Sequence, residues 1–146
     1  MTVSKLEVIY LTFNYFQLMF DAITNSQGTL LIIHYSDSVN RKETSQCVEL
    51  VRSFLPKLKP GFTVIVDLER LVHMDVDCAE DLGKVMDLCN QAKVNHIRRA
   101  LPNPEVDIGL NIISRFHYDE QHVSIKTYPS FYQAMKSFLL AEGKRN

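Results

Sequence analysis

From residue 29 onward, the hydrophobic pattern of the chain changes repeatedly between the period of a β-strand and the period of an α-helix. Short apolar runs rich in β-branched residues predict strands. They occupy four stretches, at residues 29–35, 62–68, 96–101 and 123–127. Apolar residues at helical spacing predict helices over about 41–58 and 78–92, a third that opens at Pro104, and a last one after Ser130.

Capping residues mark the start of each predicted helix, at Asn40, Asp77, Asn103 and Ser130. Three of them are followed by the acid or amide of a capping box: Glu43, Glu80 and Gln133. Alternating strands and helices predict a mostly parallel sheet with right-handed crossovers. Residues 15–24, joined to the first strand by the turn Asn25–Gly28, are expected to form a hairpin with it. The predicted fold class is α/β, with a mixed, mostly parallel sheet, about four α-helices and an N-terminal hairpin.

A chain of 146 residues suits one domain, and no Gly/Ser-rich linker or internal repeat divides it. We assign residues 15–146 to a single α/β domain. Residues 1–14 form an N-terminal extension whose pattern fits a strand, a helix or a docking segment. The apolar stretch 6–20 is shorter than the roughly 20 residues of a membrane helix, and Glu7 and Asn14 interrupt it. We therefore expect neither a signal peptide nor a membrane span.

Composition narrows the classes of function. The formal net charge is −1, which gives no global field to attract nucleic acid or an anionic membrane. The cysteines are odd in number, match no zinc spacing and fall on apolar helix stripes, at Cys47, Cys78 and Cys89. They are expected to be small buried hydrophobes in a reducing compartment. We therefore predict a cytoplasmic protein with no metal and no cofactor.

The most informative segment follows the second predicted strand. Within Val66–Asp75, the strand ends in Asp67-Leu68, and the pair Met74-Asp75 precedes a helix. This pattern resembles the signature of the STAS family, which includes the anti-sigma factor antagonists, and the element order agrees over residues 15–142. The resemblance implies a STAS-like fold and a regulatory module that binds a partner protein without catalysis. The expected partner is an anti-sigma-like kinase or another signalling protein.

Departures from the family pattern fall at its functional positions. In the family, the aspartate is followed by a serine that a partner kinase phosphorylates, and phosphorylation switches binding off. Here Val76 occupies the serine position and Cys78 that of the family glycine, so the resemblance implies a binder without this switch. It places partner binding on the loop from His73 to Asp77 and on the helix that follows, at His73, Asp75, Val76, Asp77 and Glu80. Asp77 is also the expected N-cap of that helix.

Two further groups of polar residues are candidates for binding. Asp107 and Asn111 lie on the helix that opens at Pro104, and in STAS-like proteins the corresponding helix borders the partner surface. A basic cluster fits either a site for a phosphate or an acidic partner, or a charged, solvated strand edge, and we favour the edge. Its members are Lys93, His96, Arg98 and Arg99.

Other classes of function stay open. A STAS-like fold can hold a small ligand such as a lipid or a nucleotide, and aromatic residues could line its cleft: Phe13, Tyr15, Phe16 and Phe20. A metal-assisted phosphoryl-transfer enzyme would instead gather Asp67, Asp75 and Asp77 around Mg²⁺. Because the sequence has no catalytic triad order or glycine-rich phosphate loop, we predict no enzymatic activity. The apolar N-terminal segment favours a homodimer, because large exposed apolar patches usually meet a partner.

Overall fold

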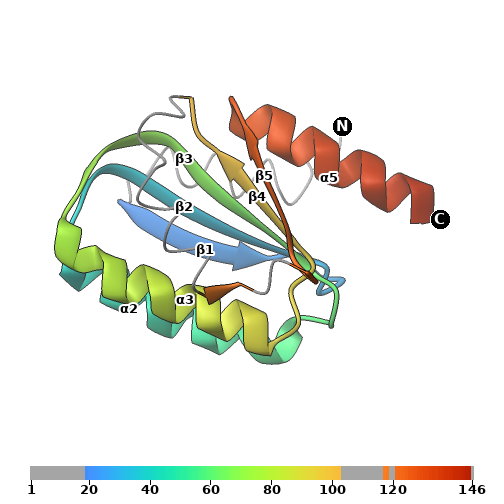
Figure 1. The fold of residues 1–146 in the computed structure, drawn as a ribbon, viewed down its shortest axis with the longest axis horizontal. Helices are drawn as coiled ribbons and strands as arrows, with labels where there is room; N and C mark the ends of the chain where they lie inside the picture. The colour runs from blue at the N-terminus through green and yellow to red at the C-terminus, as the bar shows by residue number, and fades with distance from the viewer. Residues whose placement is uncertain (1–18, 103–116, 119–120, 146) are drawn as a thin grey trace.

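The computed structural model describes residues 19–102, 117–118 and 121–145. Its centre is a five-stranded sheet in the order β1-β2-β3-β4-β5 (Figure 1). The strands are β1 (Phe20–Thr24), β2 (Leu30–Val39), β3 (Thr63–Met74), β4 (His96–Ala100) and β5 (Ser124–Tyr128). β1 runs antiparallel to β2, and the other neighbours are parallel. The mixed, mostly parallel α/β sheet and the N-terminal hairpin are therefore confirmed.

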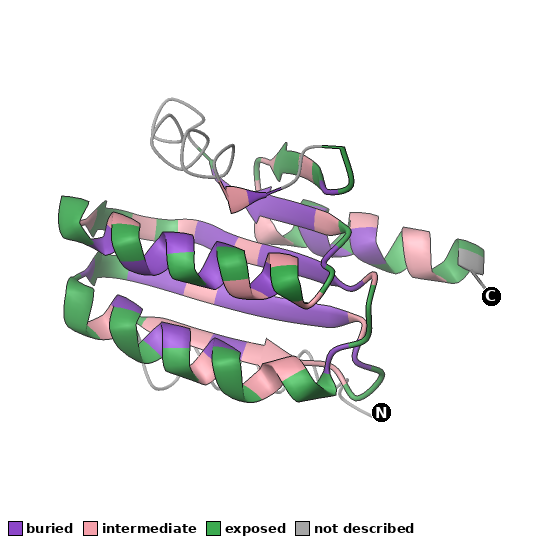
Figure 2. Cartoon of the chain, turned by 60° about the horizontal axis from the view of Figure 1, so that its bottom comes forward, coloured by how far each residue is buried: buried purple, intermediate pink, exposed green. Residues whose placement is uncertain are grey.

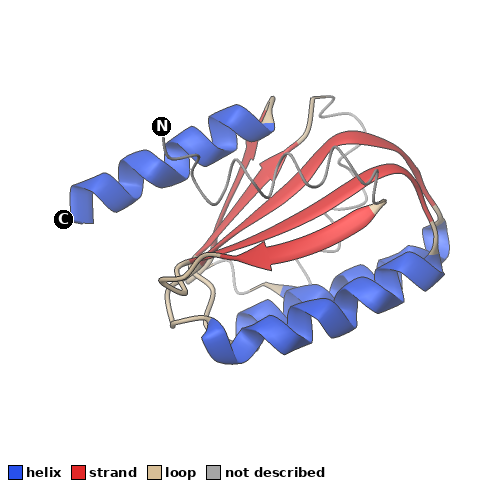
Figure 3. Ribbon diagram, turned by 180° about the vertical axis from the view of Figure 1, so that it is seen from behind, coloured by secondary structure: helices blue, strands red, loops and turns tan. Residues whose placement is uncertain are grey.

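Three α-helices cover the sheet in the part of the chain that the structure describes. α2 (Arg41–Phe54) and α3 (Ala79–Gln91) lie on one face, and α5 (Phe131–Arg145) packs on the other (Figures 1 and 3). The 3₁₀ turn η1 (Leu55–Lys57) follows α2, and a second one, η2 (Val76–Cys78), directly precedes α3. The predicted helix that opens at Pro104 lies outside the described residues. None of the three described helices is long and apolar enough to cross a membrane.

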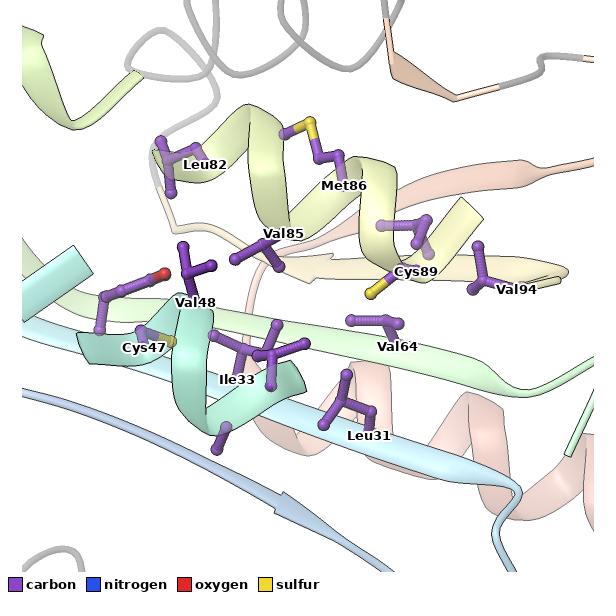
Figure 4. Close-up of a cluster of buried hydrophobic side chains, with 14 of the residues drawn as sticks. Leu31, Ile33, Cys47, Val48, Val64, Leu82, Val85, Met86, Cys89 and Val94 are labelled. Atoms are coloured by element: carbon purple, nitrogen blue, oxygen red, sulfur yellow. The ribbon is translucent and has the colours of Figure 1, made fainter. Parts of the chain in front are cut away.

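Alternation along the central strands divides the core into two layers. Leu31, Ile33 and Val64 belong to the layer under α2 and α3 (Figure 4). Their sequence neighbours Ile32 and Ile65 belong to the layer under α5, because successive side chains of a strand point to opposite faces. Both faces are therefore largely buried over residues 30–36 of β2 and 63–68 of β3 (Figure 2), which explains why these stretches have continuous apolar runs.

α2 begins with the capping box that the sequence predicts. The amide of Glu43 donates to Asn40 Oδ1 (3.2 Å), and the amide of Asn40 donates to Glu43 Oε2 (2.9 Å). The helix ends at Phe54 rather than at the expected Leu58. Pro56 explains the early end, because proline has no amide to continue the α-helical hydrogen bonds.

α5 also begins as predicted, since the amide of Gln133 donates to Ser130 Oγ (3.2 Å). Its side chains Ala134 and Phe138 are buried against the sheet. α5 continues through Gly143 to Arg145. A glycine costs a helix only about 1 kcal/mol relative to alanine, so this glycine does not force an end.

β3 is longer than the sequence predicts. The expected strand ends at Leu68, whereas the observed one continues to Met74. Residues 70–74 pair with residues 36–39 at the end of β2, through two register irregularities. The pairing of β3 with β4 covers only Thr63–Asp67, so the ends of β2 and β3 continue as a two-stranded ribbon. We call residues 36–39 and 70–74 the β2–β3 ribbon. Polar residues in the ribbon interrupt the apolar pattern, and the sequence therefore predicts a loop after residue 68 instead of a longer strand.

Candidate functional site

The chain turns from β3 into α3 at the far end of the β2–β3 ribbon, and we call residues 75–78 the β3–α3 turn. The amide of Asp75 donates to the Val39 carbonyl (3.2 Å), and the amide of Cys78 donates to the Asp75 carbonyl (3.0 Å). The Cys78 thiol is fully buried and donates to the same Val39 carbonyl (3.8 Å). These bonds fix the backbone of the turn to the end of β2.

The prediction that Asp77 caps α3 is wrong. The turn continues as η2 directly into α3, whose N-cap position is Cys78 and has no side-chain cap. Asp77 is exposed and already lies within the helical turn η2. Its carboxylate therefore does not precede the first turn of the helix, where an N-cap side chain accepts hydrogen bonds from the unpaired backbone amides. Its charge still suits a helix N-terminus. Glu80 completes no capping box, because its carboxylate instead pairs with Arg41 Nη2 (3.0 Å) and Lys84 Nζ (3.5 Å).

Val76 stands at the tip of the turn. Its side chain is 92% exposed, more than any other large hydrophobic residue in the described ranges. Val72, in the adjoining ribbon, is 81% exposed. Both valines lie at the same end of the molecule as the β3–α3 turn, and this end therefore presents apolar surface to solvent on a fixed backbone.

All five sequence-predicted partner residues are exposed at this end, and we call them the turn surface: His73, Asp75, Val76, Asp77 and Glu80. His73 Nε2 lies 2.9 Å from Asp75 Oδ1. This contact and the Glu80–Arg41 pair join side chains that are about half exposed or more. Exposed ion pairs contribute little to stability, about 0–1 kcal/mol, so a partner can replace them at small cost.

Asp81, which the sequence prediction does not include among the candidate residues, positions α3 against α2. Its carboxylate is 2% exposed and accepts hydrogen bonds from Thr44 Oγ1 (2.8 Å) and Ser45 Oγ (2.9 Å). Asp81 lies one turn before Val85 on the apolar stripe of α3, where a carboxylate is unexpected unless it has partners. That position on the stripe was the signal that could have identified it.

The structure separates the three carboxylates of the hypothetical metal site. Asp67 lies inside β3, where Oδ2 is 2.8 Å from His34 Nδ1 and Oδ1 accepts the Glu69 amide (3.1 Å). Asp75 and Asp77 follow the end of β3, roughly 25 Å further along an extended strand. No group of three or more His, Cys, Asp or Glu side chains in the described ranges is arranged to hold a metal ion. The hypothesis of a phosphoryl-transfer site at these carboxylates is therefore wrong.

The basic cluster is not a solvated strand edge. β4 is an interior strand between β3 and β5, and Arg98 and Arg99 are only 8% and 7% exposed. Their side chains point to opposite faces of the sheet, Arg98 toward α5 and Arg99 toward α3. Lys93 lies after α3 with a left-handed φ of 67°. The four residues therefore form no single patch.

The other predicted sites stay predictions. Asp107, Asn111 and the segment on which the expected homodimer rests lie outside the described residues, as do Phe13, Tyr15 and Phe16. Phe20 lies in β1 and packs against the core. A cavity of about 40 Å³ lies within the apolar layer under α3. It is far smaller than the roughly 300–1,000 Å³ of ligand pockets, so this cavity does not accommodate a lipid or a nucleotide.

The three cysteines are free and fully buried, as predicted. Burial raises the pKa of Cys47 to about 11 and that of Cys89 to about 12. Burial also raises the pKa of Cys78. Because the nucleophilic form of cysteine is the thiolate, these thiols are unreactive at neutral pH in the folded chain.

No family model and no curated protein matches this sequence. Solved structures do match its fold. An uncharacterised protein with a SpoIIAA-like fold from Shewanella loihica matches with a TM-score of 0.58 and 13% identity, over 80% of this chain and 90% of that one. The anti-sigma factor antagonist SpoIIAA in its unphosphorylated form matches with a TM-score of 0.56 and 15% identity, over 82% and 96%. Apo-SiaC from Pseudomonas aeruginosa matches with a TM-score of 0.52 and 13% identity, over 76% and 91%.

These similarities confirm the fold that the sequence predicts. The matched proteins share few residues with this chain, yet the alignments span most of each. The overall fold therefore agrees although the sequences differ. The chain has a SpoIIAA-like, STAS-like α/β fold.

Proposed function

We propose that this chain is a regulatory protein-binding module and that the turn surface is where its partner binds. The observation that carries the proposal is Val76, 92% exposed on a turn that hydrogen bonds fix to β2. A side chain on a rigid backbone loses little conformational freedom when it binds. Burying it against a partner contributes about 1.5–3 kcal/mol.

The matched structures support a regulatory role. SpoIIAA is an anti-sigma factor antagonist, and SiaC is the activator of the diguanylate cyclase SiaD, with which it forms a complex. By analogy, the partner of this chain is an anti-sigma-like kinase or another signalling protein, and the chain acts without catalysis. Its three free, buried thiols support a reducing compartment, which agrees with a cytoplasmic location.

Regulation at the turn differs from that of SpoIIAA, which occurs in a phosphorylated form. Val76 has no hydroxyl group, and residues 72–82 contain no serine, threonine or tyrosine. Phosphorylation of a hydroxyl at the β3–α3 turn therefore cannot control binding there. We propose that the turn binds its partner constitutively.

The charges around Val76 indicate the chemistry of the partner. Asp75, Asp77 and Glu80 are exposed carboxylates close to the valine in sequence. Glu80 pairs with Arg41 and Lys84, and Asp75 lies beside His73. An apolar pocket with lysine or arginine at its rim would complement this surface, because complementary charge guides association and excludes other partners.

Affinity capture with matched variants tests the proposal. The full chain, Val76→Asp and Leu139→Asp are immobilised separately, and proteins retained from a lysate of the source cells are quantified by mass spectrometry. Leu139 is the control because it is 54% exposed on α5, on the other face of the sheet. We expect Val76→Asp to lose a partner by about tenfold or more, since a charge enters an apolar contact, while Leu139→Asp retains it. Equal recovery of every protein by all three would contradict the proposal.

A further inference from the structure

A groove lies between α5 and the strands β4 and β5. α5 packs on the face of the sheet opposite to α2 and α3 (Figure 1). Its volume is about 620 Å³, within the roughly 300–1,000 Å³ that small-molecule sites occupy. β4 contributes Arg98, and β5 contributes Lys126 and Tyr128. α5 contributes Tyr132, Lys136 and Lys144. The groove therefore shares no residue with the turn surface.

The lining of the groove is strongly cationic. It includes one arginine and three lysines, and none of the described residues that line it is acidic. The whole chain has a net charge of −1, so this positive field is local. Lysines are common on protein surfaces, however, and Lys126, Lys136 and Lys144 are exposed. The lysines alone therefore do not define a site.

Arg98 adds a buried cation to the groove. It is 8% exposed, and no carboxylate of the described chain forms an ion pair with it. Its Nη1 donates to Tyr128 Oη (3.3 Å) and to Ser137 Oγ. Its Nε is buried and has no hydrogen-bond acceptor among the described residues. Burying a cation without a counter-charge is costly, and an anion in the groove would supply the missing counter-charge.

The geometry points to a small organic phosphate as the ligand, and we propose that the groove binds one. A guanidinium matches the geometry of phosphate oxygens and donates to two of them at once, and the lysines supply further positive charge. The rings of Tyr128 and Tyr132 line the same groove and offer apolar surface to the organic part. Tyr132 is 70% exposed, so this surface is free to accept a ring.

Titration of the ¹⁵N-labelled full chain, followed by amide NMR shifts, tests the proposal. The probes are AMP, phenyl phosphate and inorganic phosphate, with adenosine and phenol as uncharged controls. We expect saturable shifts in β5 and α5 with the organic phosphates, weaker ones with inorganic phosphate, none with the controls, and weaker binding at high salt. Absence of saturable shifts with all three phosphates would overturn the proposal. Binding to vesicles that contain phosphatidic acid, without binding of soluble phosphates, would also overturn it.

Matched variants assign the binding to the groove. Lys126→Gln/Lys136→Gln should weaken binding of AMP by about tenfold or more, because two charge-assisted contacts are lost. Lys42→Gln/Lys59→Gln removes two exposed lysines away from the groove and should leave the affinity within about twofold. Equal affinity of the two double variants would overturn the proposal.

Arg98→Met distinguishes a ligand-binding arginine from a structural one. Tyr128 Oη and Ser137 Oγ are 2.8 Å apart and bond to each other without the guanidinium. Replacing an uncompensated buried charge with an apolar side chain is often neutral or stabilising. We therefore expect Arg98→Met to unfold at the same or a higher urea concentration and to lose phosphate binding. A destabilised variant that still binds AMP would show that Arg98 has a structural role and does not bind the ligand. If Arg98→Met does not fold, the comparison of Lys126→Gln/Lys136→Gln with Lys42→Gln/Lys59→Gln tests the proposal instead.

Discussion

Two aspartates of the same segment, Asp77 and Asp81, have opposite surroundings. Asp77 precedes the predicted helix and matches the preference of an N-cap, yet it is exposed and caps nothing. Asp81 lies inside the helix and is buried against the hydroxyl groups of Thr44 and Ser45. The local pattern identified the turn correctly but not the role of each carboxylate, because the partners of Asp81 lie 36 and 37 residues away in sequence.

Alanine substitutions at the two aspartates should separate these roles. Asp81→Ala removes the acceptor of two hydroxyl groups, one of them fully buried, and should lower the free energy of unfolding by about 1–3 kcal/mol. Asp77→Ala should change it by less than about 0.5 kcal/mol, whereas a true N-cap would cost about 1 kcal/mol. Urea denaturation followed by circular dichroism measures both. A larger loss for Asp77→Ala than for Asp81→Ala would contradict the structure.

At the scale of elements, the β2–β3 ribbon positions the candidate site. It carries the β3–α3 turn beyond the end of β4, and its register contains two irregularities. Asp37 lies at one of them, with a left-handed φ of 56°. The sequence predicted the buried halves of both strands because their apolar runs are continuous. It did not predict the ribbon, because the pairing of its polar residues depends on the neighbouring strand rather than on local hydrophobicity.

Substitutions at Asp37 should test this conformation. Glycine adopts a positive φ without strain, so Asp37→Gly should keep or slightly raise the stability. Asp37→Val places a β-branched residue in that region and should destabilise the fold by about 1–2 kcal/mol. It should also shift the amide resonances of residues 73–78. Ser38→Val is the matched control, since Ser38 is exposed in the same ribbon and has no positive φ. Equal stability of the two valine variants would show that Asp37 does not adopt the left-handed conformation.

At the scale of the whole molecule, the sheet separates two surfaces of different chemistry. The apolar and acidic turn surface follows β3, and the cationic groove lies under α5 on the other face. Periodicity and capping residues predicted the order of elements, and the alternation of strands and helices then predicted a mostly parallel sheet. The position of Arg98 and Arg99 could not be predicted in this way. Whether β4 is an edge or an interior strand depends on whether β5 pairs with it. The sequence around the two arginines does not predict that pairing.

The buried thiols link the stability of the whole fold to pH. Burial raises the pKa of Cys47 and Cys89 from an ordinary value of 9 to about 11 and about 12. A group whose pKa is raised by folding contributes its full stabilisation below the pKa of the unfolded chain and loses it as the pH rises toward the folded value. We therefore expect the free energy of unfolding to fall from about pH 9 upward, by about 1.4 kcal/mol per pH unit for each thiol.

Urea denaturation at pH 7, 9 and 10.5 measures this slope. The slope for Cys89→Ala should be smaller by the contribution of one thiol, about 1.4 kcal/mol per pH unit. This comparison of slopes does not depend on how much stability the variant loses at pH 7. Equal slopes for the variant and the natural chain would show that Cys89 ionises as readily in the fold as in the unfolded chain, which its complete burial does not allow.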